Sequence, residues 1–420
     1  CFIFAEFATN QTKRIIAMKN FIKKYCCLQK GSVISGSLLI AGTSIGAGML
    51  ALPLVTSYGG FFPALAIFAV CWASMVATGL LILEIAMGMK KGSNIISMAG
   101  DTLGTTGKVI SWTLYLFLFY SLNIAYISGG GSFILDVFAG GAISVFGPLL
   151  FVTVFGMIVY FGARVVGRIN IMVMTTLVVT YFAFVALGWR YVDTANLTNI
   201  NWSASLVAMP VVLTSFGFQG VVPTLISYMD HDVKKIRRAI IIGATIPFVI
   251  YAIWEWLVLG IVPLEGPEGM RSMMEAGGNV LQPLKNVIGD TNINVIHIIF
   301  AFCALLSSFF GVSLGVIDFL ADGLTIKKSF KGKILLSALA FVPPLIITMT
   351  YPHIFLVALR LGGGLGSALL LGLLPVMITW VRRYRMNDTT SYTFPGGRAA
   401  LIAIAVVAVM AVAIQIAYFV

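Results

Sequence analysis

The chain has 420 residues, of which 59% are hydrophobic and only 10% are Asp, Glu, Lys or Arg. Soluble domains carry about a quarter charged residues, so this composition excludes a soluble fold and predicts an all-α integral membrane protein. The formal net charge of +12 would suit nucleic-acid binding in a soluble protein. Here the basic residues cluster between apolar runs, which is a membrane-topology pattern, and we expect no nucleic-acid partner.

Residues 1–30 precede the first apolar run and form a basic segment that we expect to be cytoplasmic. Residue 1 is Cys, so Met18 is a candidate start of the native protein, and residues 1–17 are not assigned to it. We expect no cleavable signal peptide, because the first apolar run has the length of a membrane span rather than of a secretion signal.

Apolar runs of about 20 residues, the length of a membrane-spanning helix, predict about eleven spans. They lie near 33–56, 61–88, 107–135, 143–162, 168–189, 204–228, 238–260, 293–320, 333–350, 353–380 and 399–419. With the N-terminus in the cytoplasm, 23 Lys and Arg residues fall in cytoplasmic segments, three fall in outer loops, and Arg360 lies within a span. Because basic residues favour the cytoplasmic side, this split predicts a cytoplasmic N-terminus and an external C-terminus.

The first predicted span is interrupted by glycine. Its centre reads Gly42-Thr43-Ser44-Ile45-Gly46-Ala47-Gly48, and Pro53 follows. Glycine lowers helix stability, and irregular backbone within a bilayer is tolerated only where it lines a cavity or is buried in protein. Helix packing through one pair of small residues explains two of these glycines but not three with two hydroxyl residues between them. We therefore predict an unwound helix.

The sixth predicted span repeats this feature. It reads Thr214-Ser215-Phe216-Gly217-Phe218-Gln219-Gly220, and Pro223 follows. Paired glycine-interrupted spans in corresponding positions are the best sequence indication of the substrate site of a secondary transporter. Helix N-termini suit a carboxylate, and freed carbonyl groups suit an ammonium group. Two crossed, broken helices therefore predict a zwitterionic amino acid as substrate.

The predicted substrate site combines both breaks with aromatic side chains of the third span. We expect the carboxylate contacts to come from backbone N–H groups between Ser44 and Gly48. The candidate substrate-binding residues are Thr43, Ser44, Gly46, Ala47, Gly48, Ser215, Phe216, Gly217, Phe218, Gln219, Tyr120 and Tyr126. With 30 Phe and 14 Tyr in the chain, any single aromatic residue is more often a packing residue than a substrate contact.

Four charged residues lie within predicted spans, where charges are costly and therefore candidates for function. Glu84 and Asp318 lie toward the cytoplasmic ends of their spans. For these two, proton coupling and structural pairing with Lys or Arg are equally good interpretations, and we take them as the proton-coupling candidates. Glu255 and Arg360 lie in outer halves, and for them we expect mutual pairing.

Other chemistry is weakly indicated or absent. Ser307, Ser308 and Ser313 of the eighth span offer hydroxyl ligands for sodium, although serine in a membrane helix more often bonds its own backbone. The chain has no G-x-x-x-x-G-K-[ST] motif, so an ATP-driven pump would need a separate subunit. His231, His297 and His353 have no Ser or Cys in a catalytic arrangement. We predict no enzyme activity, no cofactor and no bound metal.

At these motifs the chain resembles the hydroxy/aromatic amino acid permease family, within the amino acid/polyamine/organocation superfamily. The segments that carry the resemblance are 36–53 (GSLLIAGTSIGAGMLALP), 214–223 (TSFGFQGVVP), 227–230 (SYMD) and 314–322 (LGVIDFLAD). The likeness extends from about residue 31 to the end. One departure is Gln219, which cannot carry a proton and stands where family members often have histidine.

The resemblance implies a LeuT-type inverted repeat with discontinuous helices 1 and 6. Its units would be residues 31–190 (helices 1–5) and 200–382 (helices 6–10), preceded by the N-terminal segment 1–30 and followed by an additional helix 11 at 399–420. It also implies a bacterial cytoplasmic (inner) membrane protein. The implied activity is proton-driven uptake of an aromatic amino acid, tyrosine first, with tryptophan and phenylalanine as alternatives.

Other classes of function stay open at the level of sequence. A sodium-coupled symporter would use the same fold, whereas a channel or facilitator would place the glycines in helix packing around a pore and would not accumulate substrate. A membrane enzyme is disfavoured, since no catalytic constellation is present. We expect an amino acid, a proton and membrane lipid as partners, and we assign no oligomeric state or stoichiometry.

Overall fold

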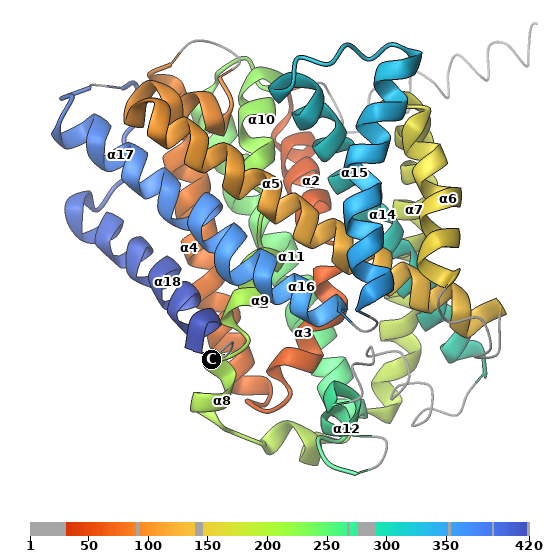
Figure 1. Ribbon diagram of the computed structural model, residues 1–420. Helices are drawn as coiled ribbons and strands as arrows, with labels where there is room; N and C mark the ends of the chain where they lie inside the picture. The colour runs from red at the N-terminus through yellow and green to blue at the C-terminus, as the bar shows by residue number, and fades with distance from the viewer. Residues whose placement is uncertain are drawn as a thin grey trace, which may run out of the picture.

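The computed structural model describes residues 31–89, 93–138, 146–266, 269–275, 291–351, 354–388 and 390–417. Residues 1–30, with the candidate start at Met18, and His353 lie outside these ranges. Every regular element within them is helical (Figure 1). This confirms the all-α prediction, and it follows from the bilayer, where each helix satisfies its own backbone hydrogen bonds.

In the described ranges, nine helices are long and apolar enough to cross a membrane. There are ten if the bent pair α2 (Val33–Ser44) and α3 (Gly48–Thr56) counts as one span. The remaining predicted span corresponds to α6 (Gly147–Tyr160), an apolar helix of 14 residues. The structure therefore confirms a helical protein that crosses the membrane many times, with α6 shorter than a full span.

The other spans follow the apolar runs, except that the third span begins at Ile95, well before its predicted start near residue 107. They are α4 (Phe61–Met87), α5 (Ile95–Phe138), α7 (Ala163–Gly188), α11 (Val233–Ile261), α14 (Thr291–Gly323), α15 (Phe330–Thr350) and α18 (Gly397–Ala417). The tenth predicted span consists of α16 (Phe355–Leu361), the π-helical η5 (Gly362–Leu373) and α17 (Leu374–Tyr384). Short elements join the spans: η2 (Trp189–Tyr191), η3 (Thr194–Thr198), α8 (Trp202–Leu206) and α12 (Met270–Glu275).

Both predicted helix breaks are present. The first span is broken between Ser44 and Gly48, where the axes of α2 and α3 differ by 58°. The sixth span is broken between α9 (Met209–Ser215) and α10 (Val222–Tyr228), with one 3-10 turn, η4 (Gln219–Val221), in the gap. The two broken spans run in opposite directions, with α2 beside α10 and α3 beside α9 (Figure 1).

The long helices around the breaks make corresponding contacts in the two halves of the chain. In one half α4 packs against α9 and α10, and in the other α11 packs against α2 and α3. Likewise α5 packs against α16 and η5, whereas α14 packs against α7. The pairs α4–α11 and α5–α14 are also in contact. Both broken spans are thereby held at the centre of the molecule, among α4, α5, α11 and α14.

Candidate functional site

A cavity of about 570 Å³ lies between the two helix breaks. Its walls come from the α2–α3 break, the α9–α10 break and the inward faces of α5, α7, α14 and η5. This volume is within the range of small-molecule sites, which are mostly apolar concavities with a few placed polar groups.

Ten of the twelve sequence-predicted substrate residues line this cavity. They are Thr43, Ser44, Gly46, Ala47, Gly48, Ser215, Gly217, Phe218, Gln219 and Tyr126. The other two point elsewhere. The Phe216 ring packs against Phe68 and Tyr251, with centroid distances of 6.1 and 5.2 Å. The Tyr120 hydroxyl donates a hydrogen bond of 2.8 Å to the carbonyl oxygen of Leu339 in α15.

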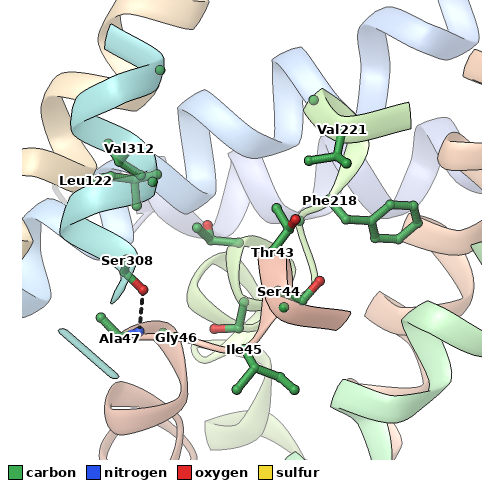
Figure 2. Close-up of a pocket in the computed structure, with 18 of the residues that line it drawn as sticks. Thr43, Ser44, Ile45, Gly46, Ala47, Leu122, Phe218, Val221, Ser308 and Val312 are labelled. Carbon is green, nitrogen blue, oxygen red and sulfur yellow. Dashed lines mark hydrogen bonds between the residues drawn. The ribbon is translucent and has the colours of Figure 1, made fainter. Parts of the chain in front are cut away.

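A hydrogen bond joins the first break to α14. The Ala47 N–H group donates to Ser308 Oγ at 2.9 Å, as Figure 2 shows. The N–H groups of Gly46 and Gly48 have no hydrogen-bond partner among the residues that the structure describes. Two free donors at the start of α3 form the kind of anion site that a helix N-terminus provides.

The C-terminal ends of α2 and α9 meet at one side chain of α11. The Tyr251 hydroxyl lies 2.6 Å from the Ser44 carbonyl oxygen and 3.0 Å from the Ser215 carbonyl oxygen, and it donates its hydrogen between them. These residues end α2 and α9, and carbonyl groups at a helix end otherwise lack intrahelical partners. Tyr251 therefore holds the two broken spans together.

We expect Tyr251→Phe to lower the uptake rate by roughly tenfold, because the one hydroxyl hydrogen shared by two buried carbonyl groups is lost. Such a loss costs about 1–3 kcal/mol, and the lower part of that range corresponds to roughly tenfold. The measurement is radiolabelled substrate uptake together with the melting temperature of the purified protein. The matched control is Tyr181→Phe, whose hydroxyl donates to the Ile250 carbonyl oxygen at 3.1 Å, away from the breaks. Equal effects of the two substitutions would contradict the bridging role.

The second break is attached to α4 through Gln219, which is fully buried. Its Oε1 accepts from the Phe218 N–H group at 2.9 Å. Its Nε2 donates to Thr78 Oγ1 at 2.8 Å and to the Met75 carbonyl oxygen at 3.1 Å. An amide supplies the donor and the acceptor that this position requires without any change of charge.

The aromatic part of the cavity differs from the expectation. The Phe218 ring is turned away from Leu122 and Val312 in Figure 2, and it packs on Gly79 of α4, where an added Cβ would lie 2.7 Å from the ring. The aromatic residues of α5 that line the cavity are Tyr115, Phe119 and Tyr126.

Helical spacing explains which tyrosines of α5 line the cavity. Successive residues are about 100° apart around a helix. Tyr115 and Tyr126 are eleven positions apart and so lie within about 20° of one face. Tyr120 and Tyr126, six positions apart, diverge by about 120°. The sequence thus contained the signal for Tyr115, which our prediction missed.

Two other parts of the lining were missed. The η5 segment contributes Leu370 and Leu371. A cluster of four glycines at 362–364 and 366 marks this segment as a third irregular span, and π-helical segments often occur at functional sites. From α7, Asn170 lines the cavity, and its Oδ1 is buried without a hydrogen-bond partner in the described residues.

The two proton-coupling candidates do not line this cavity. Glu84 is buried and accepts hydrogen bonds from Arg383 Nε at 2.6 Å and from the Phe394 N–H group at 2.7 Å. Asp318 is exposed, forms a 2.8 Å ion pair with Lys328, and lines a separate cavity near Asn94.

The expected pairing of Glu255 with Arg360 is wrong. In the part of the chain that the structure describes, Glu255 forms no ion pair, and its hydrogen-bond partner is the hydroxyl group of Thr56 at the end of α3.

The three candidate sodium-ligating serines have other partners. Ser308 accepts from Ala47, the Ser307 hydroxyl lies 3.0 Å from Met174 Sδ, and the Ser313 hydroxyl donates to Asn123 Oδ1 at 3.1 Å. The described residues contain no cluster of three His, Cys, Asp or Glu side chains that would suit a metal ion.

A bundle that crosses the membrane many times around a cavity at two broken helices defines a membrane transport protein rather than an enzyme. The model of the tryptophan/tyrosine permease family matches residues 29–415, and the chain belongs to this family.

Individual relatives are similar over most of their length. Tyrosine-specific transport system 1 of Haemophilus influenzae is 32% identical, over 91% of this chain and 96% of that protein. The tryptophan-specific transport protein of Pseudomonas aeruginosa is 31% identical, over 89% and 92%. The low affinity tryptophan permease of Escherichia coli is 28% identical, over 88% and 91%.

Proposed function

We propose that this protein imports an aromatic amino acid as a secondary active transporter, by proton symport and alternating access. The observation that carries the proposal is the cavity at the two helix breaks, with free N–H groups of Gly46 and Gly48 on one wall and aromatic side chains of α5 on another. The relatives named above, which are tryptophan- and tyrosine-specific transport proteins, support the substrate class.

In the proposed complex the substrate carboxylate accepts from the N–H groups at the start of α3. The ammonium group lies at the carbonyl ends of the half-helices, where the helix dipole favours a cation. The aromatic side chain lies between Tyr126 and Leu122 of α5 and Val312 of α14, which all line the cavity. The other lining residues of the two breaks, including Thr43, Ala47 and Gly217, supply shape rather than charge.

Tyrosine is our first choice of substrate, with tryptophan next and phenylalanine third. The unpartnered Asn170 Oδ1 in the cavity wall accepts a hydrogen bond. Tyrosine offers a hydroxyl donor and tryptophan an indole N–H donor, whereas phenylalanine has neither and leaves the buried acceptor unsatisfied. Sites that hydrogen-bond a substrate group discriminate strongly against analogues that lack it.

The cavity is open toward the basic end of the molecule. Its lining extends along α5 from Tyr126 to Tyr115, and two neighbouring cavities share Tyr115. Toward the other end, Tyr251 and the rings of Phe68, Phe216 and Phe248 pack together. With the basic loops in the cytoplasm, this is an inward-facing conformation, the N-terminus is cytoplasmic and the C-terminus is outside. We place the protein in the bacterial inner membrane.

We propose a LeuT-type inverted repeat with units 31–190 and 200–382 and with helix 11 at 399–420 as an addition. The support is the correspondence of contacts: α4 with α9 and α10 matches α11 with α2 and α3, and α5 with α16 and η5 matches α14 with α7. Transporters built this way bind substrate between the repeats and alternate access around the bound substrate.

The test is uptake of labelled tyrosine, tryptophan and phenylalanine into vesicles under separately imposed proton and sodium gradients. We expect accumulation with the inward proton gradient, up to about tenfold per pH unit for one proton per substrate, and none with sodium alone. Accumulation with sodium alone would show a sodium symporter. Equilibration without accumulation would show a facilitator.

A further inference from the structure

Glu255 is a carboxyl group in an unusual environment. It lies in the outer half of α11, and its side chain is fully buried. Oε1 is hydrogen-bonded to Thr56 Oγ1, and Oε2 has no hydrogen-bond partner in the described residues. A buried carboxylate anion with one partner and no counter-ion is very costly, so this environment favours the neutral acid.

Glu84 is also buried, and its environment is the opposite of that of Glu255. Glu84 receives two N–H donors from the guanidinium group of Arg383 and one from the backbone of Phe394. This is the arrangement that stabilises a buried carboxylate anion. Of these two buried glutamates, Glu84 is paired with an arginine and Glu255 has no counter-ion among the described residues.

The hydrogens around Thr56 support a protonated Glu255. The Thr56 hydroxyl has one hydrogen and lies near two oxygen atoms: the Leu52 carbonyl oxygen, at 2.8 Å, and Glu255 Oε1. When the hydroxyl donates to Leu52, a bond that is common for threonine in helices, the hydrogen between Thr56 and Glu255 has to come from the carboxyl group.

Glu255 lies on the face of α11 that contacts the broken helices on the closed side of the cavity. Tyr251 is one helical turn before Glu255 on the same face of α11. It holds the ends of α2 and α9, and Thr56, the partner of Glu255, ends α3. One face of α11 therefore holds three ends of the broken helices on the side opposite the cavity opening.

We propose that Glu255 binds the co-transported proton and that this proton is required to close the outer side of the cavity. In the outward-facing state α3 separates from α11, and a proton from external water binds a carboxylate oxygen of Glu255. The neutral acid then packs against Thr56 as the outer side closes. The proton leaves to cytoplasmic water through the cavity, past Tyr251, which contacts the carbonyl groups of the cavity-lining residues Ser44 and Ser215. Only an O–H bond forms and breaks. This inference rests on the proton symport proposed above.

Within the described ranges, other titratable side chains lie on the elements that pack against α11, but they do not pair with Glu255. They are Cys71 and Glu84 on α4, Arg164, Arg168 and Tyr181 on α7, and Arg190 and Tyr191 in η2. His297 of α14 stacks on Phe184 at 5.0 Å and lies 6.0 Å from the ring of Trp254, the residue before Glu255. Within the described residues none of these side chains hydrogen-bonds to Glu255.

The experiment compares the full-length parent with Glu255→Gln in proteoliposomes. Labelled tyrosine reports accumulation under an imposed pH gradient and counterflow without one, and a pH-sensitive dye inside the liposomes reports proton entry driven by substrate. Glutamine is neutral and of the same size, so it mimics the protonated acid. We expect gradient-driven accumulation to fall from about tenfold per pH unit to none, substrate-driven proton entry to disappear, and counterflow to stay within twofold.

Two further variants test whether the loss of accumulation is specific to Glu255. Glu265→Gln is the matched control, because Glu265 is an exposed residue paired with Arg271 at the surface, and we expect parental accumulation. Asp318→Asn tests the competing carboxylate at the cytoplasmic end.

Three outcomes would overturn the inference. They are parental accumulation by Glu255→Gln, joint loss of its accumulation and counterflow, and selective loss of accumulation in Asp318→Asn with Glu255→Gln unaffected. A parent that shows no proton-driven accumulation overturns the proposed symport itself, which separates the two failures.

A second measurement applies when Glu255→Gln fails to fold. Infrared spectra of the parent protein in H₂O and D₂O are expected to contain a carboxylic-acid carbonyl band at neutral pH. This band should be missing from Glu255→Ala or Glu255→Met, whichever is stable, because neither has a carboxyl group at this position, while the carboxylate bands remain. A parent spectrum without an acid carbonyl band refutes the neutral Glu255 on which the inference depends.

Discussion

Gly46→Val is expected to reduce uptake by about two orders of magnitude while leaving membrane insertion intact. A Cβ atom at position 46 would overlap the side chain of Ser308, which holds the break by accepting from the Ala47 N–H group. Overpacking costs about 1–3 kcal/mol, and the upper value is roughly a factor of 100 in affinity. The valine methyl groups also stand where the substrate carboxylate would approach the backbone.

Initial uptake rates and binding of labelled substrate to purified protein measure this effect. The matched control is Gly167→Val on α7, where an added Cβ has open space around it. We expect this control to transport within twofold of the parent. Near-parental uptake by Gly46→Val would contradict the assignment of the α2–α3 break to the substrate site.

Removal of either partner of the Glu84–Arg383 pair is expected to lower stability by about 3–5 kcal/mol, the usual effect of leaving one buried charge alone. Both side chains are largely buried, with exposed fractions of 6% and 11%. The pair joins the end of α4 to α17 and, through the Phe394 N–H group, to the segment before α18.

A double-mutant cycle of Glu84→Gln and Arg383→Met measures this coupling through unfolding of the purified protein. We expect the double variant to be more stable than the sum of the single effects predicts, because it contains no unpaired buried charge. Asp318→Asn is the control for an exposed pair and should change stability by at most about 1 kcal/mol. Additive effects at Glu84 and Arg383 would contradict a buried ion pair.

Much of the fold could be predicted because its signals are local. A span needs about 20 apolar residues, so the hydrophobic runs mark most helix ends from α4 to α18 to within a few residues. The exception is α5, which begins at Ile95 rather than near residue 107. The breaks could be predicted for a similar reason. Glycine destabilises a continuous helix, and irregular backbone within a bilayer is tolerated where it lines a cavity, as at Gly46, Gly48 and Gly217. The η5 segment carried a similar glycine signal that was not used.

The contacts of the side chains were predicted less well. Tyr120 and Phe216 are aromatic residues beside the site, but the faces of α5 and α9 turn them toward α15 and toward Phe68. The expected pairing of Glu255 with Arg360 rested only on the similar depth of the two residues in the membrane. Depth is a property of the sequence and topology, whereas pairing depends on which helix faces meet.

The sequence by itself determined the class of protein, the spans and the places where two of them break, because length, hydropathy and glycine act on neighbouring residues. Only the tertiary structure decided the partners. Arg383 meets Glu84 across 299 positions, and Thr56 meets Glu255 across 199. Tyr251 joins the ends of α2 and α9. Such contacts depend on how distant helices pack, and packing depends on the shapes of all the side chains between them.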